Sequence, residues 1–167
     1  MTGLAATLAL DIKRQQRSGL YAIGIFGAIV LGLVARWVMP ERYAGQVLSG
    51  LYLLGLSSTT FIFCASQVLL DRTQGTLLAL RASPLTADAY VLSKVLTLTA
   101  FSLVEAVIIF VIAFWGAPLN LLPLALGVLP LGLMYALIGL GLVAAHDSLL
   151  SFLLPGAALV GAVSQLP

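Results

Sequence analysis

The stretch VLTLTAFSLVEAVIIFVIAFW, residues 95–115, contains a single charged residue, Glu105. An α-helix rises about 1.5 Å per residue, so about 20 residues cross the hydrocarbon core of a membrane, which is about 30 Å thick. The 21 residues that follow Lys94 match this length. The stretch therefore predicts a transmembrane helix with one acid at its midpoint.

Four further stretches without any Asp, Glu, Lys or Arg are long enough to span the membrane. They cover residues 19–35, 44–70, 121–145 and 148–167. Their apolar residues are continuous and do not alternate with polar ones, so helices fit better than a membrane barrel. The predicted fold class is all-α, a polytopic transmembrane helical bundle with about five spans in a single domain over 1–167.

The composition also favours a membrane protein. Hydrophobic residues make up 61% of the chain and charged residues 8%, whereas a soluble domain is about 45–50% apolar and about 25% charged. A chain of 167 residues cannot bury so much apolar surface in one soluble core. A broad basic face for nucleic acid is excluded, and the single cysteine, Cys64, excludes a disulfide framework or a multi-cysteine metal site.

The lysines and arginines gather on one side of the predicted spans. If the N-terminus is cytoplasmic, six of the eight basic residues lie inside, and Arg36 and Arg42 lie outside. Cytoplasmic loops carry an excess of Lys and Arg, so we expect a multi-pass protein with its N-terminus in the cytoplasm. The sizeable polar segment 71–94 is then a cytoplasmic loop between the second and third spans.

Segment 1–17 precedes the first predicted span. Leu4, Leu8 and Ile12 recur every four residues, which places them on one face of a helix. The basic cluster that begins at Lys13 follows the first apolar residues instead of preceding them, unlike a secretory signal peptide. We expect an interfacial amphipathic helix that lies on the membrane surface, and a frayed tail is the alternative.

The cytoplasmic loop predicts a short helix with a break at each end. Gly75 permits a turn, Thr76 can cap the helix, and Pro84 disfavours helix at the residue before it. Either Thr86 or Asp88 can then cap a helix that leads into the third span. Such a short helix suits the docking of a cytoplasmic partner, and simple coverage of the bundle end is the alternative.

The same loop carries an ordered pattern of residues. The pattern is Asp71-Arg72-x-x-Gly75-Thr76-Leu77-x-x-Leu80-x-x-Ser83-Pro84-Leu85, followed by Tyr90-Val91-Leu92-x-Lys94 and an apolar run. It resembles the cytoplasmic loop of ABC-2 type permeases, and small bacterial drug-export permeases such as the fluoroquinolone-export type look most similar. The sequence departs from that family at Thr73, where a second acid is common, and in having five predicted spans where six are usual. We therefore expect either a C-terminal truncation or a different span count.

The resemblance implies a permease subunit that forms the substrate path of an ATP-driven exporter in a bacterial plasma membrane. The loop would provide a coupling helix that docks on a separate ATPase subunit, and two permease chains, as a homodimer or heterodimer, would work with two ATPases. A G-x-x-x-x-G-K-[ST] phosphate-binding loop does not occur in the sequence. The resemblance assigns ATPase coupling to Asp71, Arg72, Gly75, Thr76, Leu77, Leu80, Arg81 and Pro84.

Glu105 and the hydroxyl cluster Ser57-Ser58-Thr59-Thr60 lie near the midpoints of adjacent predicted spans. A charged acid at the membrane centre costs about 2.5–3.5 kcal/mol on insertion scales, so Glu105 should face protein or water. We expect it to bond to the hydroxyl cluster and form a polar layer on the translocation path. A purely structural bond between helices, worth about 0.6 kcal/mol, is the alternative.

Enzymatic function receives little support from the sequence. Ser57 and His146 could form a nucleophile and base, but the predicted spans place them at different depths in the membrane. No set of residues is expected to bind a metal or cofactor. Two other functions stay open, a secondary transporter driven by an ion gradient with Glu105 as proton carrier, and a non-transporting protein that anchors or assembles partners.

Overall fold

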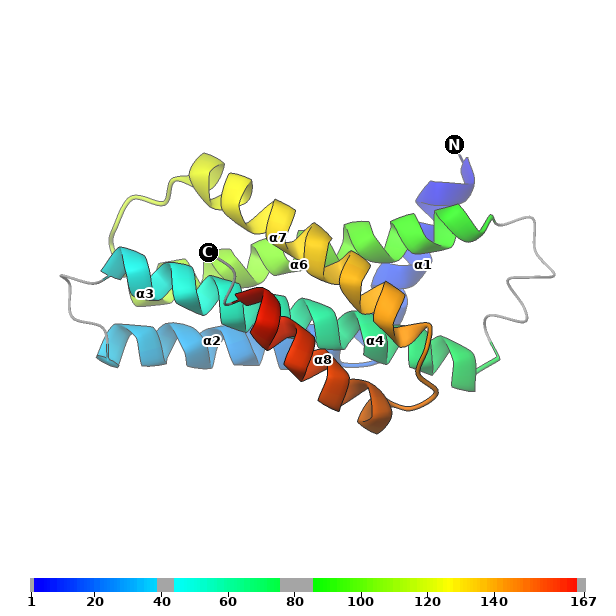
Figure 1. Cartoon of the computed structure of the whole chain (residues 1–167). Coiled ribbons are helices and arrows are strands. Elements are labelled where there is room, and N and C mark those ends of the chain that lie inside the picture. The colour runs from blue at the N-terminus through cyan, green and yellow to red at the C-terminus, as the bar shows by residue number, and fades with distance from the viewer. Residues whose placement is uncertain (1, 39–43, 76–85, 165–167) are drawn as a thin grey trace.

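The computed structural model describes residues 2–38, 44–75 and 86–164, and this part of the chain consists of helices joined by short turns, with no strand. The predicted all-α fold class is therefore confirmed. Figure 1 shows an elongated bundle, and α1 crosses it near one end. In chain order the elements are α1 (Thr2–Arg17), α2 (Leu20–Val38), α3 (Ala44–Leu51), the π-helical turn η2 (Tyr52–Leu56), α4 (Ser57–Thr73), α6 (Ala87–Ala113), α7 (Leu121–Val143) and α8 (Leu149–Ser164).

The predicted spans appear in the structure in three forms. In the described part of the chain, α2, α6 and α7 are each long and apolar enough to cross a membrane. The predicted span 44–70 consists of α3, η2 and α4, which follow one another without a gap along the chain. Helix α8 has 16 residues, which rise about 24 Å, so it is shorter than the predicted 148–167 span.

Helices reach into the predicted cytoplasmic segment 71–94 from both sides. Asp71 belongs to α4, and α6 begins at Ala87, where the sequence predicts a helix that leads into the third span. The Thr86 hydroxyl accepts a hydrogen bond of 3.3 Å from the Ala89 amide, so Thr86 is the N-cap of α6. Gly75 adopts a positive φ of 68°, as a turn after α4 requires. The predicted short helix lies in 76–85, outside the described residues.

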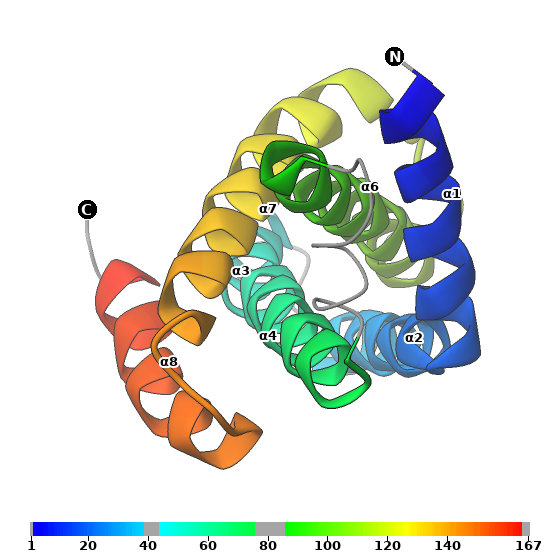
Figure 2. The same ribbon diagram turned by 90° about the vertical axis from the view of Figure 1, so that its right-hand side faces the viewer.

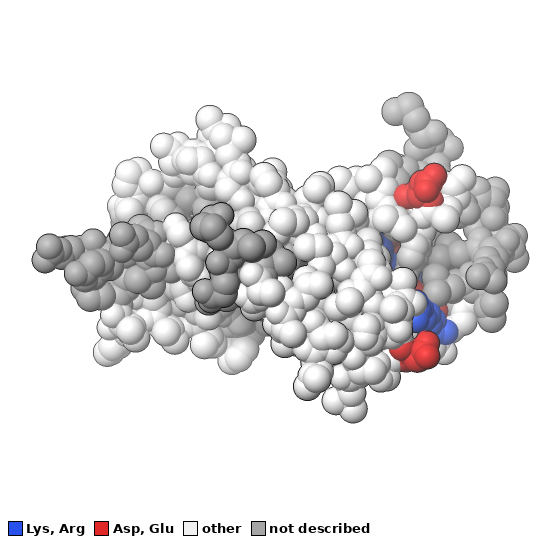
Figure 3. Space-filling view, viewed as in Figure 1, with Lys and Arg blue, Asp and Glu red and all other residues white. Residues whose placement is uncertain are grey.

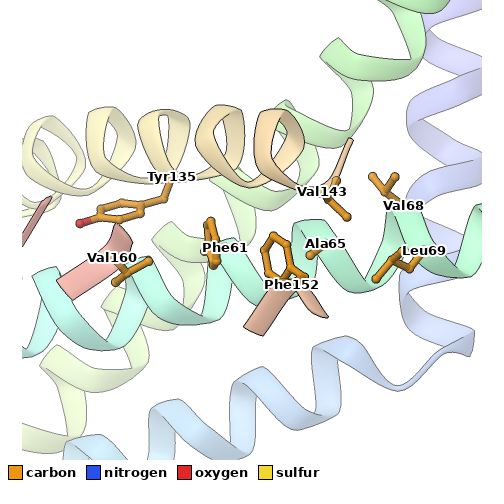
Figure 4. Close-up of a cluster of buried hydrophobic side chains, with 8 residues drawn as sticks. All are labelled: Phe61, Ala65, Val68, Leu69, Tyr135, Val143, Phe152 and Val160. Atoms are coloured by element: carbon orange, nitrogen blue, oxygen red, sulfur yellow. The ribbon is translucent and has the colours of Figure 1, made fainter. Parts of the chain in front are cut away.

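A cluster of apolar side chains holds α4, α7 and α8 together (Figure 4). The rings of Phe61 and Phe152 stack with their centroids 4.6 Å apart. Gly139 on α7 and Gly156 on α8 pack directly against Phe61. A Cβ atom added at Gly139 would lie 3.2 Å from the Phe61 backbone oxygen, and one added at Gly156 would lie 2.5 Å from the Phe61 ring. These two glycines let three helices close around one aromatic ring, as small residues commonly do in membrane bundles.

Small residues also form the contact between α2 and α6. Gly24, Ala28, Gly32 and Ala35 are the buried residues of α2, and their spacing of three or four places them on one helical face. A Cβ atom added at Gly32 would lie 2.9 Å from the Ile112 Cβ. The two backbones therefore approach more closely than larger side chains would allow.

The outer surface of the bundle is apolar along the helices and charged near one end. Large apolar side chains such as Phe26, Leu126 and Leu150 are exposed on α2, α7 and α8, a surface that water would disfavour and lipid would accept. Figure 3 shows charged side chains on this face near the end that carries α1 and the end of α4. The fold is that of a polytopic helical membrane bundle.

The close packing of α2 on α6 predicts different effects for two glycine substitutions on the same helix. Gly32→Ala places a methyl group 2.9 Å from the branched Ile112 side chain, so we expect a loss of about 1–3 kcal/mol in unfolding free energy. Gly27→Ala is the control, because a Cβ atom there has nothing within 4 Å and both changes raise helix propensity equally. Unfolding of both variants in detergent, followed by circular dichroism, measures the difference. Equal stabilities would contradict the close contact.

Candidate functional site

Helix α1 turns its polar face toward the bundle. Thr7, Asp11 and Gln15, spaced by four residues, are buried, whereas Leu10 and Ile12 are exposed. Figure 2 shows α1 crossing beside α6 and reaching α2, and contacts join it to both helices. The sequence interpretation considered only the apolar face of this helix and missed the polar face, which builds the site.

Lys94 of α6 lies at the centre of a buried group of charges, and its side chain is 2% exposed. Its Nζ atom is 3.1 Å from Asp11 Oδ1 of α1 and 2.9 Å from Asp71 Oδ2 of α4. The same ammonium donates to Gln67 Oε1 of α4 at 3.3 Å. One lysine therefore joins three helices that come from distant parts of the sequence.

Further donors satisfy the two carboxylates. Arg14 approaches Asp71 Oδ1 at 3.4 Å, and the Tyr90 hydroxyl donates to Asp71 Oδ2 at 2.8 Å. The Ser93 hydroxyl donates to Asp11 Oδ2. Two basic and two acidic side chains balance in formal charge; Lys94, Asp11 and Asp71 are buried, whereas the Arg14 side chain is 47% exposed. Such pairing is what permits charges to be buried. We call Asp11, Arg14, Asp71 and Lys94 the ion cluster.

A layer of amide and hydroxyl groups adjoins the ion cluster. Gln15 donates through Nε2 to Gln67 Oε1 at 3.1 Å and to Thr97 Oγ1 at 2.9 Å. The Tyr21 hydroxyl donates to Gln15 Oε1 and so brings α2 into the network. Buried polar networks of this kind define a unique arrangement of helices, because each side chain must satisfy several partners at once.

The ion cluster borders a cavity of about 580 Å³. Its lining comes from the end of α1, the last two turns of α4 and Lys94, and includes Arg14, Arg17, Gln67 and Asp71. Among the described residues, no group of three or more His, Cys, Asp or Glu side chains could bind a metal ion. The chemistry available here is ion pairing and hydrogen bonding.

Arg72 follows Asp71 but points to a different helix. Its guanidinium donates to the backbone oxygens of His146 at 2.8 Å and Ala144 at 3.4 Å, just beyond the end of α7. A cation at a helix C-terminus satisfies orphan carbonyls and interacts favourably with the helix dipole. Its pairing with Asp147 spans 3.9 Å, and Asp147 is fully exposed, so the carbonyl contacts define the role of Arg72.

The residues predicted to couple to an ATPase fall into two groups in the structure. Asp71 and Arg72 contact other helices of the bundle, and Gly75 forms the turn after α4. The others lie outside the described residues: Thr76, Leu77, Leu80, Arg81 and Pro84. Asp71 is buried, and Lys94, Arg14 and Tyr90 contact its carboxylate inside the bundle.

The hydroxyl cluster and Glu105 meet deeper in the bundle. The Thr59 hydroxyl lies 3.0 Å from Glu105 Oε2, so the predicted hydrogen bond between the two spans is present. Thr60 is buried, and its hydroxyl has no hydrogen-bond partner in the part of the chain that the structure describes. Ser58 of the cluster is half-buried, and the side chain of Ser57 is outside the described set.

Long apolar helices with buried, paired charges near one end define the chain as a polytopic membrane protein. The family model for ABC-2 type transporters matches residues 4–163. The chain therefore belongs to the ABC-2 type transporter family, and it is a membrane permease component of an ABC transporter. No curated protein and no solved structure shows significant similarity to it.

The ion cluster predicts a large effect for removal of its central cation. Lys94→Met leaves the carboxylates of Asp11 and Asp71 buried without their shared ammonium. Removing one partner of a buried pair costs about 3–5 kcal/mol, so we expect a loss of that size in unfolding free energy, measured by denaturation in detergent. Adding Asp11→Asn to the Lys94→Met variant should recover part of the loss, because it removes one uncompensated charge.

Asp147→Asn serves as the control for this prediction. Its carboxylate is also paired with a basic residue, but it is fully exposed, so we expect no measurable change in stability. A Lys94→Met variant as stable as Asp147→Asn would show that the ion cluster does not hold the three helices together.

Proposed function

We propose that the chain is the permease subunit of an ATP-driven exporter in a bacterial plasma membrane. In this proposal its helices line the substrate path, and a separate ATPase docks on the cytoplasmic segment 71–94. Two permease chains, identical or different, work with two ATPases. The small drug-export permeases are the subtype that the loop pattern favours.

The observation that carries this proposal is the 2.9 Å ion pair between Asp71 and Lys94. These residues stand at the two ends of the proposed docking segment, one on α4 and the other on α6. The ion pair therefore holds the two ends of the segment together, and the second ion pair, between Lys94 and Asp11, connects them to α1. In this proposal, a displacement that a partner imposes on the segment moves α1, α4 and α6 together.

Arg72 extends the proposed coupling to a fourth helix. It contacts the carbonyls beyond the end of α7, so the end of α4 and the end of α7 move as one unit as long as these bonds hold. Within the coupling set, Asp71, Arg72 and Gly75 position the segment, while Leu77, Leu80 and Arg81 contact the ATPase. The N-terminus and the ion cluster lie on the cytoplasmic side, in agreement with the distribution of basic residues.

The coupling proposal predicts that changes in the docking segment release the ATPase. The triple variant Leu77→Ser, Leu80→Ser, Arg81→Ser removes apolar and cationic contacts while leaving the ion cluster intact. We expect the affinity-tagged triple variant, purified from membranes of its own host, to carry at least tenfold less ATP hydrolysis activity than the wild type, with unchanged thermal stability.

Leu119→Ser is the matched control, because it introduces the same change in the turn between α6 and α7 at the opposite end of the bundle. It should retain the ATPase activity. Equal ATPase recovery with the triple variant and the wild type would reject the coupling role of the segment. Transport that stops with an uncoupler and continues after ATP depletion would instead favour the ion-gradient mechanism.

A further inference from the structure

We infer that Glu105 forms a recognition site for organic cations on the translocation path, and that the substrates are cationic amphiphiles. The inference rests on the proposed function, because it names the substrate class of the exporter. It starts from a difference among the buried acids in the described part of the chain. Asp11 and Asp71 share the ammonium of Lys94, whereas Glu105 has no ion-pair partner.

The Glu105 carboxyl is enclosed and only partly bonded. The residue is 2% exposed, and its Oε2 atom lies 3.0 Å from the Thr59 hydroxyl. Its Oε1 atom is buried and has no hydrogen-bond partner among the described residues. A carboxyl oxygen without a partner in an apolar interior is costly, and a cationic ligand would supply the missing partner.

The hydrogen bonds around Thr59 fit a neutral Glu105 carboxyl. The Thr59 oxygen lies 3.0 Å from Leu56 O and 3.0 Å from Glu105 Oε2, but a hydroxyl has one hydrogen to donate. Both contacts are satisfied when Thr59 donates to Leu56 O and the protonated Glu105 carboxyl donates to Thr59. The neutral acid is also the form that the membrane interior accepts.

The Phe101 ring lies beside the carboxyl and packs against two further aromatic rings. A Cβ atom added at Gly24 would lie 2.5 Å from Glu105 Oε1 and 2.6 Å from the Phe101 ring, so acid and ring flank the same point of α2. The ring centroid of Phe101 is 4.6 Å from that of Tyr21 and 6.2 Å from that of Phe63. Ring faces attract cations and also pack against apolar substituents.

Charge conservation selects the class of ligand. When an organic monocation binds, the O–H bond of the Glu105 carboxyl breaks, the proton leaves to water, and the carboxylate pairs with the cation. The layer is neutral before and after this exchange, whereas an anion would add an uncompensated charge at low dielectric. Among the described residues, Gly24 faces the carboxyl from α2 and Thr59 from α4, and neither carries a charge; Tyr52 donates its hydroxyl to Ala106 O.

A π-helical turn lies next to Glu105, at the point where we propose that a ligand reaches the carboxyl. The π-helical turn Tyr52–Leu56 ends just before α4, and the Thr59 hydroxyl contacts its last carbonyl. Single π-helical turns have a weaker hydrogen-bond ladder than the α-helix and occur frequently at functional sites. A small change in this turn would move Thr59 away from Glu105 and expose the carboxyl to a ligand.

The test compares two probes of the same shape and opposite charge, tetraphenylphosphonium and tetraphenylborate. Binding of each is measured by equilibrium dialysis against the purified full-length chain in detergent, with the difference between wild type and Glu105→Gln as the signal. We expect Glu105→Gln to weaken tetraphenylphosphonium binding at least tenfold and to leave tetraphenylborate unchanged. Glu105→Asp keeps the carboxylate and should retain part of the binding.

Asp88→Asn is the matched control, because it removes an exposed carboxylate from the same helix, and binding should stay at the wild-type level. Circular dichroism and gel filtration confirm that each variant is folded. Equal binding of tetraphenylphosphonium by wild type and Glu105→Gln, or equal effects on both probes, would overturn the cation site. Because this assay needs no ATPase, such a result would leave the coupling proposal standing, and loss of ATPase capture would leave cation binding standing.

Discussion

The requirement to neutralise one buried lysine organises the end of the bundle. Lys94 lies inside the protein at the start of a membrane helix, where an unpaired ammonium would be strongly disfavoured. Asp11 and Asp71 neutralise it from two other helices, and each carboxylate then needs its own further donors. Helix α1, the end of α4 and the start of α6 are consequently fixed relative to one another by charge as well as by packing.

The two polar regions of the interior differ in how their charged groups are paired. The charges of the ion cluster are all paired, so the cluster suits a permanent joint between helices. Glu105 shares one hydrogen bond with Thr59 and has an oxygen without a partner among the described residues, next to a π-helical turn. In the proposed transport mechanism, the ion cluster transmits motion between helices, and Glu105 exchanges one binding partner for another.

Much of the fold followed from the sequence because helix length and membrane thickness are linked directly. The apolar runs located α2, α6 and α7, and of the two caps that the sequence left open for α6, Thr86 and Asp88, the structure shows Thr86. The site was harder to predict. Asp11 was missed because the Leu4, Leu8 and Ile12 periodicity drew attention to a neighbouring stripe of α1, although Thr7, Asp11 and Gln15 are also spaced by four.

The sequence by itself determined an all-helical membrane bundle, the three helices long enough to span the membrane, and a hydrogen bond between Glu105 and the hydroxyl cluster, in which Thr59 is the residue in contact. These features depend on composition, on local spacing and on depth in the membrane, all of which can be counted along the chain. Only the tertiary structure decided that Asp71 and Arg72 face the bundle and that Lys94 joins α1, α4 and α6. The physical reason is that an ion pair depends on which helices pack together and on their rotation, and no local pattern specifies either.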